Sequence, residues 1–265
     1  MEMITSPQNE WVAQARKLKQ KKYREDRGAF LAEGLRLSEE AAKAGVVEEV
    51  FYHESLADTA RGEILLKQLA AKTKHFYKVS AKIVNTLAET ETPQGIVCVC
   101  KVRKIALKDF QPDNGPILVA DGIQDPGNLG AILRTLWAAG GQALFCLKGT
   151  TDPYGGKCVR ASMGGVFHAP VFADIDWQTT VKWALARGYA IVAADSSKGV
   201  DYRKASWREK TILCVGSEAL GLNSIPEEDI DEYVHIPLAK DAESLNAAVA
   251  AGILIFESVR SGLVQ

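Results

Sequence analysis

The sequence predicts an α/β protein with two parts: a smaller α/β layer domain, then a parallel sheet covered by helices on both faces. Short apolar runs alternate with amphipathic ones, and this alternation occurs twice along the 265 residues. Continuous apolar runs between helical patterns are typical of parallel strands that are buried on both faces. The chain is also about twice the common domain size of ~100–150 residues, which favours two domains.

The first half is predicted to mix short strands with helices. Apolar residues recur at helical spacing from Trp11 to Leu18, and a helix at 35–44 is expected to end at Gly45. Further strands are expected at 29–32, 50–53, 75–79 and 95–102, and further helices at 64–71 and 81–87. The apolar pattern then stops, and residues 111–116 form a turn-rich stretch. We therefore predict domains at 1–108 and 109–265.

The second half is predicted to begin with a buried strand at 117–120 and a helix at 129–139 that ends at Gly140-Gly141. The elements expected after them are strands at 143–147, 189–194, 211–215 and 233–238, and helices at 177–187 and 245–260. Strands that alternate with helices in this way predict a parallel sheet.

The composition excludes several classes of protein. Hydrophobic residues make up 47% and charged residues 25% of the chain, as in soluble globular domains. No apolar run approaches the ~18 residues of a membrane span, and the N-terminus has no signal-peptide core, so we expect a cytoplasmic protein without a membrane partner. The net charge of −1 gives no argument for nucleic acid, which must rest on local clusters. The chain has five cysteines, an odd number, and no C-x-x-C pair, so we expect no disulfide framework. No histidine lies at ligand spacing from a cysteine, so we expect no metal site.

Three loops that follow predicted strands are candidate ligand sites, because parallel α/β sheets bind ligands at the carboxyl ends of their strands. The first loop has neither a G-x-G-x-x-G fingerprint nor a P-loop. We expect Asn128 to cap the helix that follows it. Arg134 is expected on the second turn of that helix, on a face left open by Ala131 and Ala138. A helix cap followed by a surface arginine is the alternative interpretation.

The second and third loops add further polar residues. Gly216 and Gly221 surround Glu218, which indicates close approach of the backbone to a ligand, although a plain strand-to-turn connection also explains the glycines. In the third loop we expect Ser244 to cap the last helix, while Asn246 offers both a donor and an acceptor. Each loop alone is a weak signal, but the three in this order are specific.

In combination, the loops resemble the SpoU (TrmH-type) family of RNA ribose 2′-O-methyltransferases, within the SPOUT superfamily. The family motif N-x-G-A-x-x-R matches residues 128–134, and a G-x-E-x-x-G-L-like loop matches 216–222. The third motif, I-P-(M/L) followed by S-L-N, matches 236–238 and 244–246. Residues 160–164 look like the family's intervening segment, and the resemblance covers residues from about 117 to 261.

The chain departs from the family pattern at three positions. Ala219 and Lys240 stand where glycine is usual, and Ala247 stands where valine is frequent. Side chains at 219 and 240 would crowd the loops that the family wraps around its cofactor. The principal polar residues of the motifs are all present.

The resemblance implies a parallel-sheet SPOUT domain with a C-terminal trefoil knot, S-adenosylmethionine as cofactor, and a homodimer packed through this domain. The cofactor-binding residues that it implies are Ala194, Gly216, Ile236, Leu238 and Leu245. The catalytic residue that it implies is Arg134, supported by Asn128, Glu218, Ser244 and Asn246. A protonated guanidinium, whose pKa lies above ~12, has no acceptor. Clamping a phosphate and stabilising a developing alkoxide is the alternative role for Arg134, and the identity of the proton acceptor is left open.

The first half resembles, more loosely, the RNA-binding extension of several ribosomal-RNA members of this family, which is like a small ribosomal protein. The matching stretches are 30–34 and 92–96. A basic cluster around Tyr23 can track RNA phosphates while the tyrosine stacks on a base, and a solvated helix face is the alternative. The cluster consists of Arg16, Lys17, Lys19, Lys21, Lys22 and Arg24.

We therefore predict an S-adenosylmethionine-dependent RNA 2′-O-ribose methyltransferase that acts on large-subunit (23S) ribosomal RNA. A transfer-RNA 2′-O-methyltransferase is one alternative, and a catalytically inactive RNA-binding relative is another. Ala219 and Lys240 favour the inactive relative, whereas the complete motif at 128–134 opposes it. Methylation of a base nitrogen is a third alternative, but the S-L-N signature fits the ribose branch better.

Overall fold

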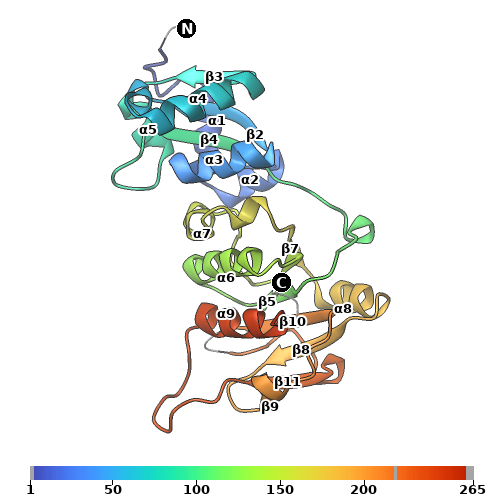
Figure 1. The fold of residues 1–265 in the computed structure, drawn as a ribbon. Helices are drawn as coiled ribbons and strands as arrows, with labels where there is room; N and C mark the ends of the chain where they lie inside the picture. Colours follow the sequence, from blue (N-terminus) through green and yellow to red (C-terminus); the bar gives the residue numbers. More distant parts are fainter. Residues whose placement is uncertain (1–2, 218–219, 261–265) are drawn as a thin grey trace. The chain divides into compact units, whose positions relative to one another are not determined.

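The structure is a computed structural model that describes residues 3–217 and 220–260 (Figure 1). Two compact units make up the chain. The first contains the chain up to Lys104 together with Tyr154–Phe167, and the second contains Ile105–Pro153 and the chain from His168 onward. The mixed α/β class and the parallel sheet predicted from the sequence are both confirmed.

In the described part of the first unit, four strands form a sheet in the order β1-β4-β2-β3. β4 (Ile96–Lys101) is antiparallel to β1 (Ala29–Glu33) and β2 (Val47–Tyr52), whereas β2 and β3 (His75–Lys78) are parallel. The helices are α1 (Glu10–Lys17), α2 (Lys21–Arg27), α3 (Leu35–Ala44), α4 (Ala60–Lys72) and α5 (Ala81–Leu87). The sequence does not predict α2, since Tyr23 is the one apolar residue of this helix.

The segment Tyr154–Phe167 belongs to the first unit, although the sequence places it between two strands of the second. It contains the short helix α7 (Gly156–Ala161), which contacts β1. The rings of Tyr154 and Phe167 lie 5.1 and 5.8 Å from the ring of Phe30. Arg160 Nη1 pairs with Glu89 Oε2 at 2.9 Å. The first unit is therefore built from two separate stretches of chain.

In the described part of the second unit, seven parallel strands follow the order β7-β6-β5-β10-β8-β11-β9. They are β5 (Ile117–Asp121), β6 (Ala143–Leu147), β7 (Val171–Ile175), β8 (Ala190–Ala194), β9 (Val200–Asp201), β10 (Thr211–Gly216) and β11 (Glu232–His235). β5 and β6 are buried along their whole length, as their apolar runs predict. The sequence does not predict β7, whose apolar run Asp174 interrupts, or the two-residue β9.

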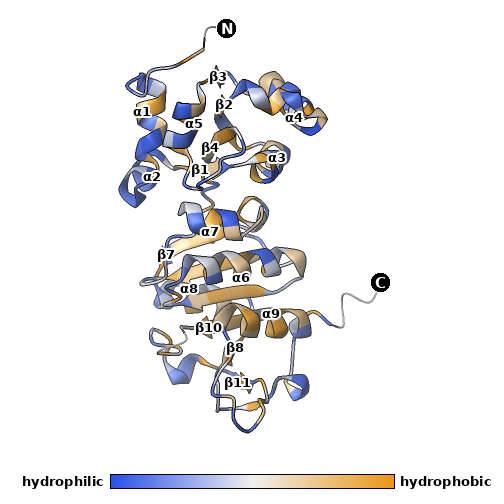
Figure 2. Cartoon of the chain, turned by 90° about the vertical axis from the view of Figure 1, so that its left-hand side faces the viewer, coloured by the Kyte–Doolittle hydropathy of each residue, from blue (hydrophilic) through white to orange (hydrophobic). Residues whose placement is uncertain are grey.

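Helices α6 (Pro126–Ala138), α8 (Trp177–Leu185) and α9 (Ala247–Ser258) cover this sheet. α8 packs on the face that carries Ile117, Val119 and Phe145. Because side chains alternate along a strand, Leu118 faces the opposite side, where α6 and α9 lie side by side (Figures 1 and 2). In the described ranges, none of the helices has the length and apolar character needed to span a bilayer.

Candidate active site

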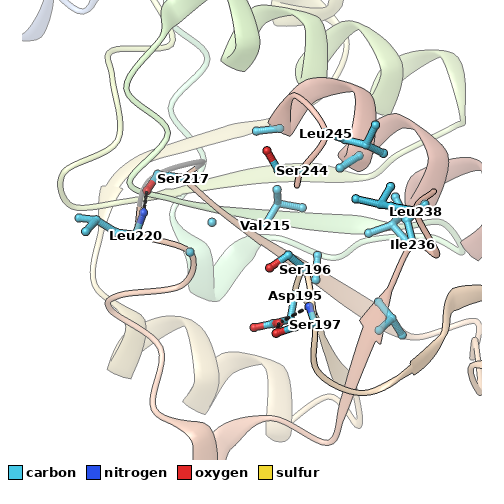
Figure 3. A pocket seen from close by; sticks show the side chains of 17 residues that line it. Asp195, Ser196, Ser197, Val215, Ser217, Leu220, Ile236, Leu238, Ser244 and Leu245 are labelled. Carbon is cyan, nitrogen blue, oxygen red and sulfur yellow. Dashed lines mark hydrogen bonds between the residues drawn. The ribbon is translucent and has the colours of Figure 1, made fainter. Parts of the chain in front are cut away.

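A cavity of about 390 Å³ opens at the carboxyl ends of the neighbouring strands β8, β10 and β11 (Figure 3). Every residue that the sequence predicts to bind the cofactor lines it, namely Ala194, Gly216, Ile236, Leu238 and Leu245. Figure 3 shows Ile236, Leu238 and Leu245 grouped on one side of the cavity and Ser217 and Leu220 on the other. The cavity therefore combines an apolar wall with the loop that follows β10.

Glycines shape the loop after β10. A Cβ atom on Gly216 would lie 2.1 Å from the carbonyl carbon of Gly221, so only glycine fits there. Gly221 has a φ of +61°, and Ser217 and Gly221 exchange backbone hydrogen bonds at 3.1 and 2.9 Å. These hydrogen bonds hold Ser217 and Gly221 together at the wall of the cavity.

Asp195, directly after β8, presents a carboxylate to the same cavity. Its Oδ1 accepts hydrogen bonds from the backbone N–H groups of Ser197 and Lys198, both at 2.8 Å. Burial acts to raise the pKa of Asp195, but these hydrogen bonds, together with the Ser197 hydroxyl and the charge of Lys198, outweigh it and hold the pKa below its ordinary value. The ionised carboxylate can accept hydrogen bonds from ligand hydroxyl groups. The sequence analysis did not single out Asp195, although a carboxylate directly after a predicted buried strand could have been recognised as a candidate site residue.

The N-terminal ends of α6 and α9 meet through a hydrogen bond. Asn246 Nδ2 donates to Asn128 Oδ1 at 3.0 Å. The prediction that Asn128 caps α6 is wrong, because the helix begins at Pro126 and Asp125 Oδ1 accepts from the Asn128 N–H at 2.9 Å. Proline suits the first helical position, where its missing N–H costs nothing. Asn128 is therefore a first-turn residue whose side chain is held by α9.

The predicted cap of the last helix is also wrong. Asn246 caps α9, since its Oδ1 accepts from the N–H groups of Ala248 and Val249 at 3.0 and 3.3 Å. Ser244 is exposed and lines the cavity instead. β11 ends at His235, earlier than the predicted 238, so the chain from Ile236 onward leaves the sheet and forms cavity wall.

Arg134 is exposed on α6 and does not line the cavity. Arg134 follows Asn128 by six residues, or about 240° around the helix, so the two residues lie on different faces of α6. With the described residues it makes no hydrogen bond or ion pair. Glu218, the remaining predicted catalytic residue, lies outside the described residues. Neither Asn128 nor Asn246 lines the cavity, but Leu245 and Ala247, the chain neighbours of Asn246, do. The structure thus joins Asn128 to a residue next to the cavity wall and leaves Arg134 exposed.

Asp121, which ends β5, anchors the loop after β10. Its side chain is 1% exposed, and Oδ2 accepts from the backbone N–H groups of Asn223 and Ser224, both at 2.7 Å. The anchored segment follows Gly221, which lines the cavity. Sequence analysis did not single out Asp121, because its partners lie far along the chain.

The predicted RNA-binding cluster is split between α1, α2 and the turn that joins them. Arg16, Lys17, Lys21 and Lys22 are exposed, whereas Lys19 is half-buried and donates to the carbonyl of Ala88 at 2.6 Å. The prediction that Arg24 binds RNA is wrong. It is buried, and its Nη1 donates to the carbonyl oxygen of Leu18 at 2.7 Å, so its guanidinium stabilises the fold and is not offered to RNA.

Comparison with known proteins matches two family models to the chain. The SpoU rRNA Methylase family matches residues 115–256, and the MRM3-like substrate binding domain matches residues 9–98. A relative from Bacillus subtilis, "23S rRNA (guanosine(2553)-2'-O)-methyltransferase RlmP", is 34% identical over 97% of this chain and 98% of its own length.

Solved structures resemble the chain over nearly its whole length. The AdoMet-bound rRNA methyltransferase from Sinorhizobium meliloti is 33% identical with a TM-score of 0.87, covering 99% of this chain and 98% of that one. The SpoU methyltransferase AviRb from Streptomyces viridochromogenes, in complex with AdoMet, is 27% identical with a TM-score of 0.86, covering 97% and 99%.

Proposed function

The chain belongs to the SpoU rRNA methylase family, and we propose that it methylates a ribose 2′-hydroxyl of 23S ribosomal RNA. As a member of this family it is an S-adenosylmethionine-dependent RNA 2′-O-methyltransferase. The observation that carries the proposal is the single cavity in which all five residues expected at the cofactor converge from three strand ends. The relative named for 23S rRNA spans nearly the whole chain, which favours this RNA over transfer RNA.

The cavity fits the cofactor chemically. Its volume of about 390 Å³ lies within the usual ~300–1,000 Å³ of ligand sites. Ile236, Leu238 and Leu245 suit the faces of an adenine, and the Asp195 carboxylate suits the ribose hydroxyls. S-adenosylmethionine supplies an electrophilic methyl group on its sulfonium. We assign the binding roles to the five predicted residues with Asp195 added.

The remaining catalytic roles are assigned to residues around the cavity. Asn246 holds Asn128 through a hydrogen bond, so both amides are oriented before RNA arrives. We propose that Arg134 binds the phosphate beside the target ribose and stabilises the negative charge that develops on the ribose 2′-oxygen. The Ser244 hydroxyl, which lines the cavity, and the carboxylate of Glu218 complete the proposed catalytic set.

RNA docking is assigned to the first half of the chain. Residues 9–98 match a substrate-binding domain, and Arg16, Lys17, Lys21 and Lys22 are exposed cations on α1 and α2. We propose that these residues contact RNA phosphates. The domains are proposed as RNA substrate binding at 1–108 and methyl transfer at 109–265, with Tyr154–Phe167 supporting the first.

We further propose a cytoplasmic homodimer packed through the methyltransferase domain. Figure 2 shows α9 as a predominantly hydrophobic helix. Val249 and Phe256 are 51% and 45% exposed, and with Gly252 and Ile253 they recur at helical spacing on one face. An exposed apolar face of this kind indicates a partner surface. The C-terminal trefoil knot also remains part of the proposal.

The proposed function is tested by transfer of labelled methyl from S-adenosylmethionine to unmodified ribosomal RNA and transfer RNA. Arg134→Ala runs beside wild type, and the product is digested to nucleosides. We expect a 2′-O-methylnucleoside in ribosomal RNA from wild type and almost none from the variant. Labelled transfer RNA alone would replace the proposed substrate, and a methylated base would replace the proposed reaction. Absence of both transfer and cofactor binding would leave an inactive RNA-binding relative.

A further inference from the structure

A second cavity, of about 270 Å³, lies at the carboxyl ends of β6 and β7. Apolar side chains that include Leu147, Ile175 and Pro226 line it, together with the exposed side chains of Lys148 and Gln178. Because all strands of this sheet are parallel, the cavity opens at the same edge as the cofactor cavity. Only β5 separates β6 from β10, so the ends of these two strands lie about 10 Å apart.

The end of β7 is distorted where it forms this cavity. Pairing moves from Phe145 with Phe172 to Leu147 with Ile175, so two steps along β6 match three along β7. The bulge contains Asp174, whose φ of +52° is rare outside glycine. Bulges and strained residues concentrate beside binding sites, where they re-aim the side chains that follow. Here the residue that follows is Ile175, a cavity residue.

One loop joins this cavity to the cofactor cavity. Ser217 and Gly221 line the cofactor cavity, and Ser224 and Pro226, further along the same loop, line the second. Asp121 holds the middle of this loop through two backbone hydrogen bonds. A ligand in the second cavity therefore contacts the same anchored loop as the cofactor.

We propose that the second cavity receives a nucleobase of the RNA beside the methylated nucleotide. The inference rests on the proposed function. Proteins that read RNA sequence take up splayed single-stranded bases, which need apolar surface for their faces and polar groups for their edges. The cavity offers both, because its apolar lining is rimmed by the Gln178 amide and the Lys148 ammonium.

The residues that line the cavity include one cation and one anion. Lys148 forms no ion pair with any described residue, although its charge helps to lower the pKa of Asp176. Its ammonium can therefore donate to an acceptor on the edge of a base. Asp176 is the negative group at the rim. Its two carboxylate oxygens already accept from the N–H and the hydroxyl of Thr179, at 2.9 and 2.8 Å.

The test compares variants of the cavity with a matched control. Lys148→Ala and Gln178→Ala remove rim groups, and Ile175→Trp fills the cavity. Lys182→Ala is the control, because Lys182 is an exposed lysine of α8 outside the cavity lining. The substrates are a ribosomal RNA fragment that contains the mapped methylation site and versions in which each flanking nucleotide lacks its base.

Wild type should lose about tenfold in kcat/KM on one abasic RNA, the scale of one base contact. The cavity variants should show a KM for intact RNA raised by about tenfold and no longer distinguish that abasic RNA. Their dissociation constants for S-adenosylmethionine should equal that of wild type. If Ile175→Trp unfolds, Lys148→Ala and Gln178→Ala still test whether a base enters the cavity.

Two results would overturn the inference. Rim variants with wild-type KM for intact RNA, or with undiminished discrimination against the abasic RNA, would show that no base enters the cavity. Wild type that methylates no RNA would remove the proposed function and this inference with it. The two failures are distinguishable, because only the second abolishes wild-type activity.

Discussion

Replacing Asp121 by alanine should release the loop after β10 and weaken both folding and cofactor binding. The buried carboxylate accepts two backbone N–H groups, those of Asn223 and Ser224, at 2.7 Å each. A hydrogen bond to a charged group contributes about 1.5–3 kcal/mol, so the pair contributes about 3–6 kcal/mol. Water can replace part of this in the loop, and we expect the free energy of unfolding to fall by about 3 kcal/mol.

Asp121→Asn is the informative intermediate, because the amide keeps an acceptor oxygen but loses the charge. We expect it to lower the free energy of unfolding by about 1–2 kcal/mol. Urea unfolding measures both losses, and calorimetry should show weaker S-adenosylmethionine binding, since Gly221 of the same loop lines the cavity. Asp113→Ala, at an exposed carboxylate of the same unit, is the control. Asp121→Ala within about 0.5 kcal/mol of wild type, the range of neutral surface substitutions, would refute the anchoring role.

Four further predictions follow from the placement of single residues. Arg134→Ala should lower kcat by about 10²–10³ with unchanged S-adenosylmethionine affinity in calorimetry, because Arg134 does not line the cavity; an equal loss of affinity would contradict this. Gly216→Ala should abolish cofactor binding, since its Cβ would lie 2.1 Å from backbone, and a wild-type dissociation constant would show that the loop adapts. Arg16→Ala should weaken RNA binding and make the slope of log K against log salt shallower by about 0.7. Arg24→Ala should instead lower the thermal midpoint of unfolding, because its guanidinium is hydrogen-bonded inside the fold. The reverse pattern would show that Arg24 contacts RNA. Phe256→Asp should convert the proposed dimer to monomer in sedimentation analysis, and an unchanged sedimentation coefficient would place the interface elsewhere.

The sequence predicts strands well where burial is complete and poorly where it is partial. β5 and β6 are buried at every position, so their apolar runs are unmistakable. β7 lies at the edge of the sheet, and the exposed Asp174 interrupts its pattern. None of its five residues is fully buried, and its sequence shows neither a continuous apolar run nor the apolar-polar alternation that indicates a half-buried strand.

Helix starts were the second source of error, for a chemical reason. Asp125 and Asn128 are both good capping residues, and so are Ser244 and Asn246. The choice between Asp125 and Asn128 is settled by Pro126, which occupies the first position of α6. For α9, the sequence contains no equivalent signal. The cavity residues, in contrast, were implied by the family resemblance, and they lie together because the parallel sheet brings the ends of their strands to one edge.

The fate of the basic cluster shows why a near-neutral chain can still be suited to RNA. A net charge of −1 is an average over both units, whereas phosphate binding depends on cations that are exposed and close together. Of the six predicted cations, Arg24 and Lys19 each donate to a backbone carbonyl. The other four are exposed, although Lys21 also pairs with Glu25 at 3.5 Å. If all four contact single-stranded RNA, replacing all four by alanine should make the slope of log K against log salt shallower by about 3. An unchanged slope would show that the RNA is held by the region around the cavities and not by α1 and α2.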